Sequence, residues 1–175
     1  EGKSFTASNL AIILAQQRTN TLLVDADLRR GVLHNTFGLD KEPGLTDYLN
    51  NKKSLLGVIQ QTHIPNLSLM SCGSMIPNPS ESLGSLQMKR FLEEVRRKFD
   101  FIVLDTPPLE AATDAVVLGA QTDALTLVVR AGKTDKYKAQ EKLDIFNAIP
   151  TNFIGVILNG ADSTLIQDQY SYYHY

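Results

Sequence analysis

The sequence predicts an α/β fold in which a doubly wound, mostly parallel sheet is flanked by helices. Short β-branched apolar runs bounded by Gly, Pro, Asn or Asp are typical of buried parallel strands, and they lie at residues 21–27, 99–108, 123–132 and 152–160. Helical patterns separate these runs, and strands that alternate with helices indicate βαβ units. The length of 175 residues suits one domain with its own core, which we place at residues 1–160.

The first predicted element is a helix that begins at or just before Ser4 and runs to about Gln17. Leu10, Ile13 and Leu14 recur within it at helical spacing, and the polar residues that follow break the pattern. Further helices are predicted between the strands, at residues 86–99, 113–121 and 136–149.

The stretch 29–81 has the least regular pattern in the sequence. Residues 42–61 suggest two short helices, and residues 66–71 suggest a further strand. The segment 74–83 contains two prolines, which we expect to exclude a regular element there. Residues 161–175 lose the apolar periodicity, so we predict a flexible C-terminal tail.

Composition excludes several classes of protein. The formal charge of −2 argues against nucleic acid as a partner, because nucleic-acid binders usually carry a strong positive charge. The single cysteine, Cys72, has no partner for a disulfide within the chain, which fits a reducing compartment and a structural role. The longest apolar runs are about six residues, far short of the roughly 20 that span a bilayer.

Each of the four predicted strands ends in a polar residue. These residues are Asp25, Asp105, Arg130 and Asn159. The carboxyl ends of the strands of an open parallel sheet face one crevice, where ligands bind. A single Asp after a strand is often only a cap or a turn former, but the whole set indicates one shared site.

The letters "EGKS" at the start of the chain indicate the kind of ligand. Gly2, Lys3 and Ser4 match the end of the phosphate-binding loop pattern, which opens a helix as these residues are predicted to do. In such a loop the backbone N–H groups cradle phosphate oxygens, the lysine neutralises the β- and γ-phosphates, and the hydroxyl binds Mg²⁺. Because the chain starts inside this pattern without an initiator Met, we expect a fragment whose first strand is missing.

Acidic strand ends supply the second part of a nucleotide site. A P-loop ATPase needs a carboxylate at the end of an apolar strand to hold Mg²⁺, and Asp105 in "FIVLDTPP" provides one. Asp25 and Asp27 in "LLVDADLRR" add a pair whose side chains share one face if the chain stays extended. The adjacent Arg29 and Arg30 are interpreted either as ligands for phosphate or an acidic partner, or as solvated side chains.

Taken together, the motifs resemble those of the bacterial tyrosine kinases of capsule and exopolysaccharide synthesis, a branch of the P-loop ATPases. "EGKS" is similar to the end of the family's Walker A motif, "LLVDADLRRG" to its Walker A′ motif and "FIVLDTPP" to its Walker B motif. "IPNPSESL" resembles the proline-rich segment, with Ile76 in place of the first proline and Ser82 in place of a leucine. The resemblance covers essentially the whole chain and implies the P-loop NTPase fold.

The resemblance also implies roles for single residues, with ATP and Mg²⁺ as cofactors. The residues implied to bind ATP are Gly2, Lys3, Ser4 and Asn159, the last of them near the adenine. Ser4, Asp27 and Asp105 are implied to arrange Mg²⁺ directly or through water. Lys3 is implied to act in catalysis, and either Asp25 or Asp27 to accept the proton of a tyrosine hydroxyl.

The C-terminus, "QDQYSYYHY", holds four of the six tyrosines of the chain, namely Tyr170, Tyr172, Tyr173 and Tyr175. The resemblance implies an ATP-dependent tyrosine kinase that phosphorylates this cluster in cis or in trans. The alternative is a P-loop ATPase switch of the partition or division type, which would hydrolyse ATP without forming phosphotyrosine. In a third interpretation the tail is only an aromatic interaction segment.

The resemblance implies partners and a location as well. These are a membrane-spanning activator or polysaccharide co-polymerase, fused or separate, a homo-oligomer formed through contact of the tail with a neighbouring active site, and a cognate tyrosine phosphatase. The expected location is the cytoplasm, at the inner face of the cell membrane.

Overall fold

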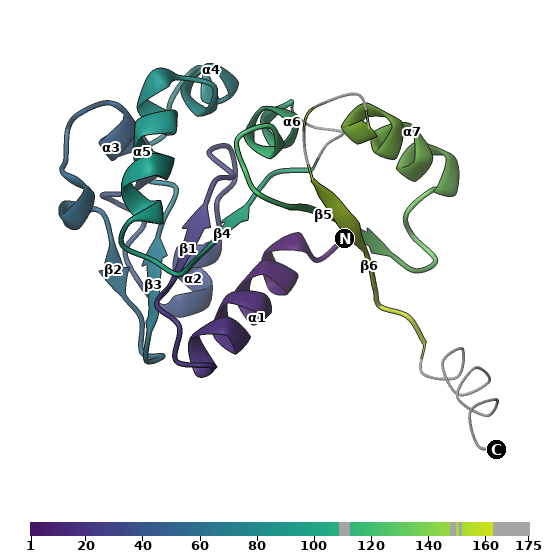
Figure 1. The fold of residues 1–175 in the computed structure, drawn as a ribbon, viewed down its shortest axis with the longest axis horizontal. Helices are drawn as coiled ribbons and strands as arrows, with labels where there is room; N and C mark the ends of the chain where they lie inside the picture. The colour runs from purple at the N-terminus through teal and green to yellow at the C-terminus, as the bar shows by residue number, and fades with distance from the viewer. Residues whose placement is uncertain (109–112, 148–149, 151, 163–175) are drawn as a thin grey trace. The chain divides into compact units, whose positions relative to one another are not determined.

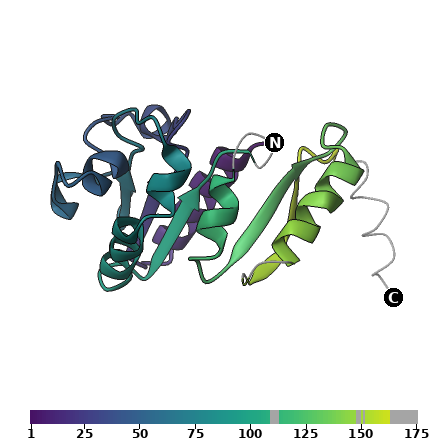
Figure 2. The same ribbon diagram turned by 90° about the horizontal axis from the view of Figure 1, so that it is seen from above.

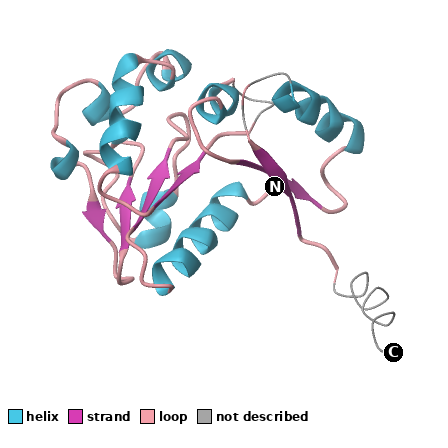
Figure 3. Ribbon diagram, viewed as in Figure 1, coloured by secondary structure: helices cyan, strands magenta, loops and turns pink. Residues whose placement is uncertain are grey.

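The chain forms two compact units in the computed structural model, which describes residues 1–175 except 109–112, 148–149, 151 and 163–175 (Figure 1). The larger unit comprises Lys3–Gln121, and the smaller comprises Glu1–Gly2 and Thr122–Tyr175. Each unit is a layered α/β arrangement (Figure 3). The α/β fold class predicted from the alternating pattern is confirmed.

The larger unit is built on a sheet of strand order β2-β3-β1-β4. The strands are β1 (Thr21–Asp25), β2 (Gln60–Gln61), β3 (Leu67–Met70) and β4 (Phe101–Asp105). β3, β1 and β4 run parallel, and the short β2 is antiparallel to β3. All five residues of β1 are buried, because the strand lies between two others and has helices on both faces.

Both faces of this sheet carry an apolar core, as a doubly wound fold requires. One face, with Leu22 and Val24 of β1, packs against α3 (Leu45–Leu49), α4 (Pro79–Leu83), α5 (Leu86–Arg96) and α6 (Asp114–Gly119). The opposite face, with Leu23, packs against α1 (Lys3–Gln16) and α2 (Leu33–Phe37). A single 3-10 turn, η1 (Leu55–Gly57), completes the elements described in this unit.

The helix α1 is confirmed, but the apolar spacing that predicted it does not mark its buried face. Leu10 and Ile13 are 47% and 56% exposed, whereas Ala11 and Ala15 are buried against the sheet. Small side chains let the helix axis approach the strands closely. Of the larger aliphatic side chains, Ile12 packs against this core, whereas Leu10 and Ile13 are left exposed. In α5, by contrast, the apolar residues at helical spacing are the buried ones, and Phe91 among them is fully buried.

The expectation that two prolines exclude a regular element between residues 74 and 83 is wrong. The helix α4 begins at Pro79, directly after Asn78. Proline is tolerated in the first position of a helix because its missing N–H would have no partner within the helix. The two short helices expected between residues 42 and 61 correspond to α3 and η1, whereas the short α2 and β2 were not predicted.

The smaller unit is a pair of parallel strands covered by one helix. The strands β5 (Leu125–Arg130) and β6 (Phe153–Asn159) run side by side, and α7 (Lys136–Asn147) lies along them (Figure 2). Phe146 of α7 stacks on Phe153 with ring centroids 6.2 Å apart. Ile154 and Leu158, on the opposite face of β6, are 64% and 59% exposed, so the prediction of fully buried strands does not hold for this strand.

Among the residues that the structure describes, no helix combines the length and apolar character needed to cross a lipid bilayer.

Candidate nucleotide-binding site

The site begins with two aspartates that end neighbouring strands. The parallel register of β1 and β4 pairs Thr21 with Phe101 at one end and Asp25 with Asp105 at the other. The two carboxylates therefore leave the sheet side by side at its carboxyl edge, where ligands bind in open α/β sheets. The strand pattern had predicted this convergence, and the register confirms it for this pair.

The N-terminus of α1 meets the same edge of the sheet. The helix begins at Lys3, and its N-terminal turn carries the partial positive charge of the helix dipole. Ser4 forms a hydrogen bond with the carboxylate of Asp105, and the charge of Lys3 acts on the same carboxylate. The structure thus brings Lys3, Ser4 and Asp105 together, as the phosphate-loop pattern predicted.

Asp25 is a buried carboxylate with an incomplete set of partners. Its side chain is fully buried, and its Oδ2 accepts a hydrogen bond from the Leu33 N–H at 3.0 Å. Its Oδ1 accepts no hydrogen bond from any residue that the structure describes. The pKa of Asp25 is raised to about 7, mainly by burial. Hydrogen bonds from the backbone of Leu33 and Asp27 oppose the rise, and the nearby charges of Asp105 and Asp27 add to it.

Asp105 is buried as well, and burial raises its pKa above the ordinary value. The charge of Asp27 adds to this rise, whereas the hydrogen bond from Ser4 and the charge of Lys3 oppose it. The charges of Asp25, Asp27 and Asp105 repel one another, and one lysine and one hydroxyl lie beside them. This environment favours a bound cation.

Asp27 lies two residues beyond β1 and is only half-buried. Its Oδ1 accepts hydrogen bonds from the backbone N–H groups of Arg29 and Arg30, at 3.1 and 2.8 Å. These bonds fix the orientation of its carboxylate relative to the loop that follows. The second oxygen, Oδ2, is not engaged by these two backbone bonds.

Arg29 is held by two residues that the sequence did not single out. Its Nε donates to Asp114 Oδ2 at 3.1 Å, and its Nη2 donates to Ser80 Oγ at 3.3 Å. Neither interpretation of this arginine, as a ligand for phosphate or an acidic partner or as a solvated side chain, anticipated this contact within its own chain, and 40% of the side chain is exposed. Asp114 begins a helix, where an acidic residue is normally only a cap, so the sequence carried no signal for this contact.

No group of three or more His, Cys, Asp or Glu side chains in the described part of the chain is arranged to hold a metal ion. Mg²⁺ is usually bound through one or two carboxylates together with phosphate and water oxygens. The oxygens that this site offers are the hydroxyl of Ser4 and the carboxylates of the strand ends.

The remaining predicted nucleotide ligands, Gly2 and Asn159, belong to the smaller unit. The register of β5 and β6 places Asn159 opposite Arg130 at the strand ends. The Asn159 amide donates to the Glu1 carbonyl at 2.9 Å, and Gly2 has a φ of +92°. A side chain at Gly2 would collide with the Asn159 amide, so this position requires glycine for both conformation and space.

The predicted phosphoacceptors Tyr170, Tyr172, Tyr173 and Tyr175 lie outside the described residues. Of the other two tyrosines of the chain, Tyr48 is buried and its hydroxyl donates to Glu94 at 3.0 Å, whereas Tyr137 is 83% exposed.

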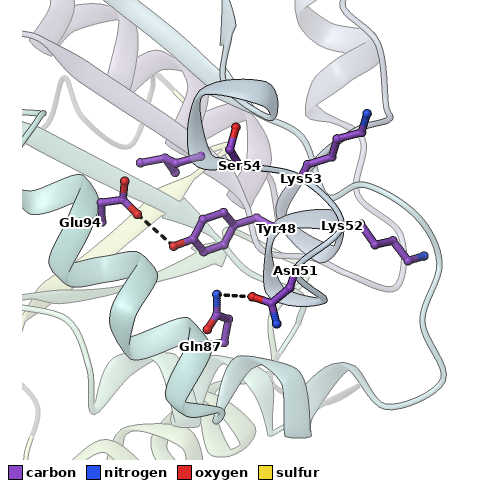
Figure 4. A pocket seen from close by; sticks show the side chains of 8 residues that line it. Tyr48, Asn51, Lys52, Lys53, Ser54, Gln87 and Glu94 are labelled. Carbon is purple, nitrogen blue, oxygen red and sulfur yellow. Dashed lines mark hydrogen bonds between the residues drawn. The ribbon is translucent and has the colours of Figure 1, made fainter.

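A separate open pocket of about 460 Å³ lies between α3 and α5 (Figure 4). Tyr48 and Glu94 form one side of it, and Gln87 donates to Asn51 at 3.1 Å on another. Lys52 and Lys53 extend from its rim. None of the predicted nucleotide ligands lines this pocket.

A Gly-Lys-Ser sequence that opens a helix, beside carboxylates that end two parallel strands, defines a P-loop nucleotide-binding domain. Residues 1–139 match the sequence profile of the AAA domain family. The fold is also similar to that of the septum site-determining protein MinD from Pyrococcus horikoshii, solved with Mg-ADP, with a TM-score of 0.76 over 95% of this chain and 71% of that one. At 21% identity this likeness shows the fold alone.

More similar proteins identify the branch. The chain is 44% identical over 158 residues to the tyrosine-protein kinase ptk of Acinetobacter johnsonii, covering 90% of this chain and 22% of that protein. It is 38% identical over 173 residues to the tyrosine-protein kinase YwqD of Bacillus subtilis, covering 99% and 73%. The kinase domain of the Escherichia coli tyrosine kinase ETK superposes with a TM-score of 0.88 at 37% identity, covering 91% of this chain and 63% of that domain.

The chain therefore belongs to the family of bacterial tyrosine-protein kinases that use the P-loop fold. It spans about a fifth of the Acinetobacter protein and almost three quarters of the Bacillus protein.

Proposed function

We propose that this chain is the catalytic part of a tyrosine kinase that binds ATP with Mg²⁺ and phosphorylates the tyrosines of its own C-terminal cluster. The observation that carries the proposal is the register that pairs Asp25 with Asp105 at the carboxyl edge of the sheet, with Ser4 hydrogen-bonded to Asp105 at the start of α1. The proposed acceptors are Tyr170, Tyr172, Tyr173 and Tyr175.

In this proposal the N-terminus of α1 binds the phosphates. Lys3 neutralises the β- and γ-phosphates, and the backbone at Gly2 contributes N–H donors. Ser4, Asp105 and Asp27 would hold Mg²⁺ directly or through water, and the ion would neutralise charge that develops on the phosphates. The orphaned Oδ1 of Asp25 and the mutual repulsion of the carboxylates support a cation here. Asn159 would lie near the adenine.

Phosphoryl transfer then requires positioning and one proton acceptor. The tyrosine oxygen forms a bond to the γ-phosphorus, the bond from that phosphorus to the β–γ bridging oxygen breaks, and ADP leaves. The phenolic proton passes to a carboxylate. Asp25 has a pKa of about 7, which suits a base near neutral pH, whereas Asp27 is the more exposed of the two and has one oxygen outside its two backbone bonds.

Charge supports a regulatory role for the tail. Four phosphotyrosines would add roughly −6 to −8 charges, which is large beside the present formal charge of −2. We propose that this change breaks contacts between subunits of a homo-oligomer in which the tail of one copy enters the active site of the next. A cognate tyrosine phosphatase would reverse it.

The setting proposed for this activity is the synthesis and export of capsular or exopolysaccharide. A membrane-spanning activator or co-polymerase, fused to this chain or separate from it, would hold the kinase in the cytoplasm at the inner face of the membrane. The proposed role in polysaccharide synthesis and the proposed membrane-spanning activator both rest on the family to which the chain belongs.

The test is to incubate the purified protein with ATP and Mg²⁺ and to map phosphotyrosine by mass spectrometry. We expect phosphate on the tail tyrosines and none in Lys3→Met. The matched control is Lys89→Met, an exposed lysine on α5, which should be labelled like the wild type. Labelling that survives Lys3→Met would overturn the proposal. So would ATP turnover without any phosphotyrosine, which is the behaviour of a switch ATPase.

To identify the base, Asp25→Asn and Asp27→Asn are compared across pH. Loss of the acidic limb of the rate profile in one variant assigns the proton acceptor to that residue.

A further inference from the structure

Three segments distant in sequence meet at the guanidinium of Arg29. Asp114 and Ser80 are 85 and 51 residues away from it along the chain, on α6 and α4. Besides the two bonds from Arg29, the Ser80 hydroxyl donates to Asp114 Oδ1, which closes a triangle of three contacts. We name these three residues the Arg29 clamp.

The clamp has a buried anchor and a half-exposed end. The Asp114 side chain is fully buried, whereas 40% of the Arg29 side chain is exposed. Both carboxylate oxygens of Asp114 accept hydrogen bonds, one from the arginine and one from the serine. A buried carboxylate that is fully paired in this way gives the arginine a fixed position, because moving the arginine would leave a buried charge unpaired.

Arg29 belongs to the same short loop that orients Asp27. The backbone N–H groups of Arg29 and Arg30 both donate to Asp27 Oδ1, so the position of this backbone determines where the carboxylate points. The loop is also fixed further along. A side chain at Gly31 would lie 2.6 Å from Cys72 Sγ and 2.7 Å from Asp25 Oδ2, and the N–H of Leu33 is bonded to Asp25.

We propose that Arg29, Ser80 and Asp114 are positioning residues that hold the loop after β1 so that Asp27 presents its Oδ2 to the bound nucleotide and its cation. None of the three needs to touch the reacting atoms. The proposal rests on the proposed kinase function for its kinetic consequence, but the clamp itself is tested without catalysis.

The structural test is hydrogen–deuterium exchange on the protein without nucleotide. In Asp114→Asn we expect faster exchange of the Arg29 and Arg30 amides, which donate to Asp27, and unchanged exchange of the Leu33 amide, which donates to Asp25. The control is Arg30→Gln, an exposed arginine of the same loop, which should leave all three amides as in the wild type. Unchanged exchange at Arg29 and Arg30, or equally faster exchange at Leu33, would overturn the proposal.

The kinetic test compares the same variants in the phosphotyrosine assay. Asp114→Asn and Arg29→Gln should lower kcat on the order of tenfold and raise the Mg²⁺ concentration for half-maximal rate, with little change in KM for ATP. Arg29→Lys should restore part of the loss because it keeps the charge, and Arg97→Gln, at an exposed arginine beyond α5, should behave as wild type. Should Asp114→Asn fail to fold, Ser80→Ala, which leaves the ion pair in place, is expected to show a smaller loss of the same kind.

Two results separate this proposal from the function on which it rests. If the wild type forms no phosphotyrosine while the amides respond as described, the clamp stands and the kinase assignment fails. If the wild type is active and Asp114→Asn retains full kcat and Mg²⁺ dependence, the positioning role is refuted even where its melting temperature falls.

Discussion

Asp25 and Asp114 are both fully buried aspartates in the larger unit, yet their surroundings differ completely. Asp114 receives an arginine on one oxygen and a hydroxyl on the other. Asp25 Oδ2 accepts a bond from the Leu33 N–H, whereas its Oδ1 has no hydrogen-bond partner among the described residues. An unpaired buried charge destabilises a fold, so folding alone does not explain Asp25. The difference separates a carboxylate that holds the structure from one that is kept for a ligand.

Asp47 is a third carboxylate, and like Asp114 it is held by hydrogen bonds within the fold. Asp47 of α3 accepts bonds from the Gly44 N–H at 2.9 Å, and from the hydroxyl and N–H of Ser74 at 2.9 and 3.3 Å. Burial pushes the pKa of Asp47 up, but these hydrogen bonds outweigh burial and hold it below the ordinary value. Asp47 thus ties the loop after β3 to α3.

The largest effect is expected for Asp47→Ala. The substitution removes the acceptor of three donors at once, and we expect the free energy of unfolding to fall by roughly 2–4 kcal/mol. Urea denaturation measures this, with Asp40→Ala, at an exposed aspartate, as the control. A loss no larger than in the control would show that Asp47 does not tie the loop.

A smaller effect of opposite sign is expected for Asp25→Asn. The amide keeps an oxygen for the Leu33 N–H and removes the buried charge, so we expect a gain in unfolding free energy on the order of 1–3 kcal/mol at pH 8. The same substitution at Asp114 should be destabilising, because it removes the partner of Arg29. If Asp25→Asn and Asp114→Asn changed the free energy of unfolding in the same direction, the distinction between the two carboxylates would be refuted.

The pH dependence of stability sharpens the contrast. The pKa of Asp25 is about 7 in the folded chain and roughly 3.9 when unfolded, so between these values the folded state binds the extra proton. Wild-type stability should therefore fall as pH rises from about 4 to 7. The advantage of Asp25→Asn should grow over that window and stay constant above it. Denaturation series at several pH values check this, and an advantage independent of pH would contradict the raised pKa.

Asp47 should behave in the reverse sense. Its pKa is lowered by folding, so its contribution is fully present above the unfolded value near 4 and is lost as pH falls through the folded value. The difference in unfolding free energy between the wild type and Asp47→Ala should therefore shrink in acid. The difference between the wild type and Asp25→Asn should already be absent there.

Local patterns in the sequence predicted the strand ends well. The apolar runs before Asp25 and Asp105 are strongly β-forming, and parallel strands in one sheet align their carboxyl ends, so both carboxylates were expected at one edge. Their pairing follows from the adjacency of β1 and β4, which the structure shows. The start of α1 at Lys3 also followed from a local motif. In each case the signal lies within a few neighbouring residues.

Tertiary packing decided the features that were missed. The buried face of α1 follows from how closely Ala11 and Ala15 let it approach the sheet, which helical spacing does not encode. The contact of Arg29 with Asp114 joins residues 85 positions apart, and no residue near either of them in the sequence indicates the contact. The rise in the pKa of Asp25 depends on burial by several elements together, so the residue could be identified from the sequence but its protonation could not.

The smallest effect tests whether a neutral group can satisfy backbone donors as the carboxylates do. Ser85 caps α5, its hydroxyl oxygen accepting from the Met88 N–H at 3.1 Å. Ser85→Ala should lower the free energy of unfolding by about 1 kcal/mol, less than Asp47→Ala, because a single donor loses its acceptor. Ser85→Asp should recover part of the loss, since a carboxylate accepts the same bond and favours the helix dipole but cannot donate to the Ser82 carbonyl, as the serine hydroxyl does at 2.7 Å. A loss in Ser85→Asp as large as in Ser85→Ala would mean that the bond to Ser82 or the packing of the serine, rather than its capping bond, stabilises this helix start.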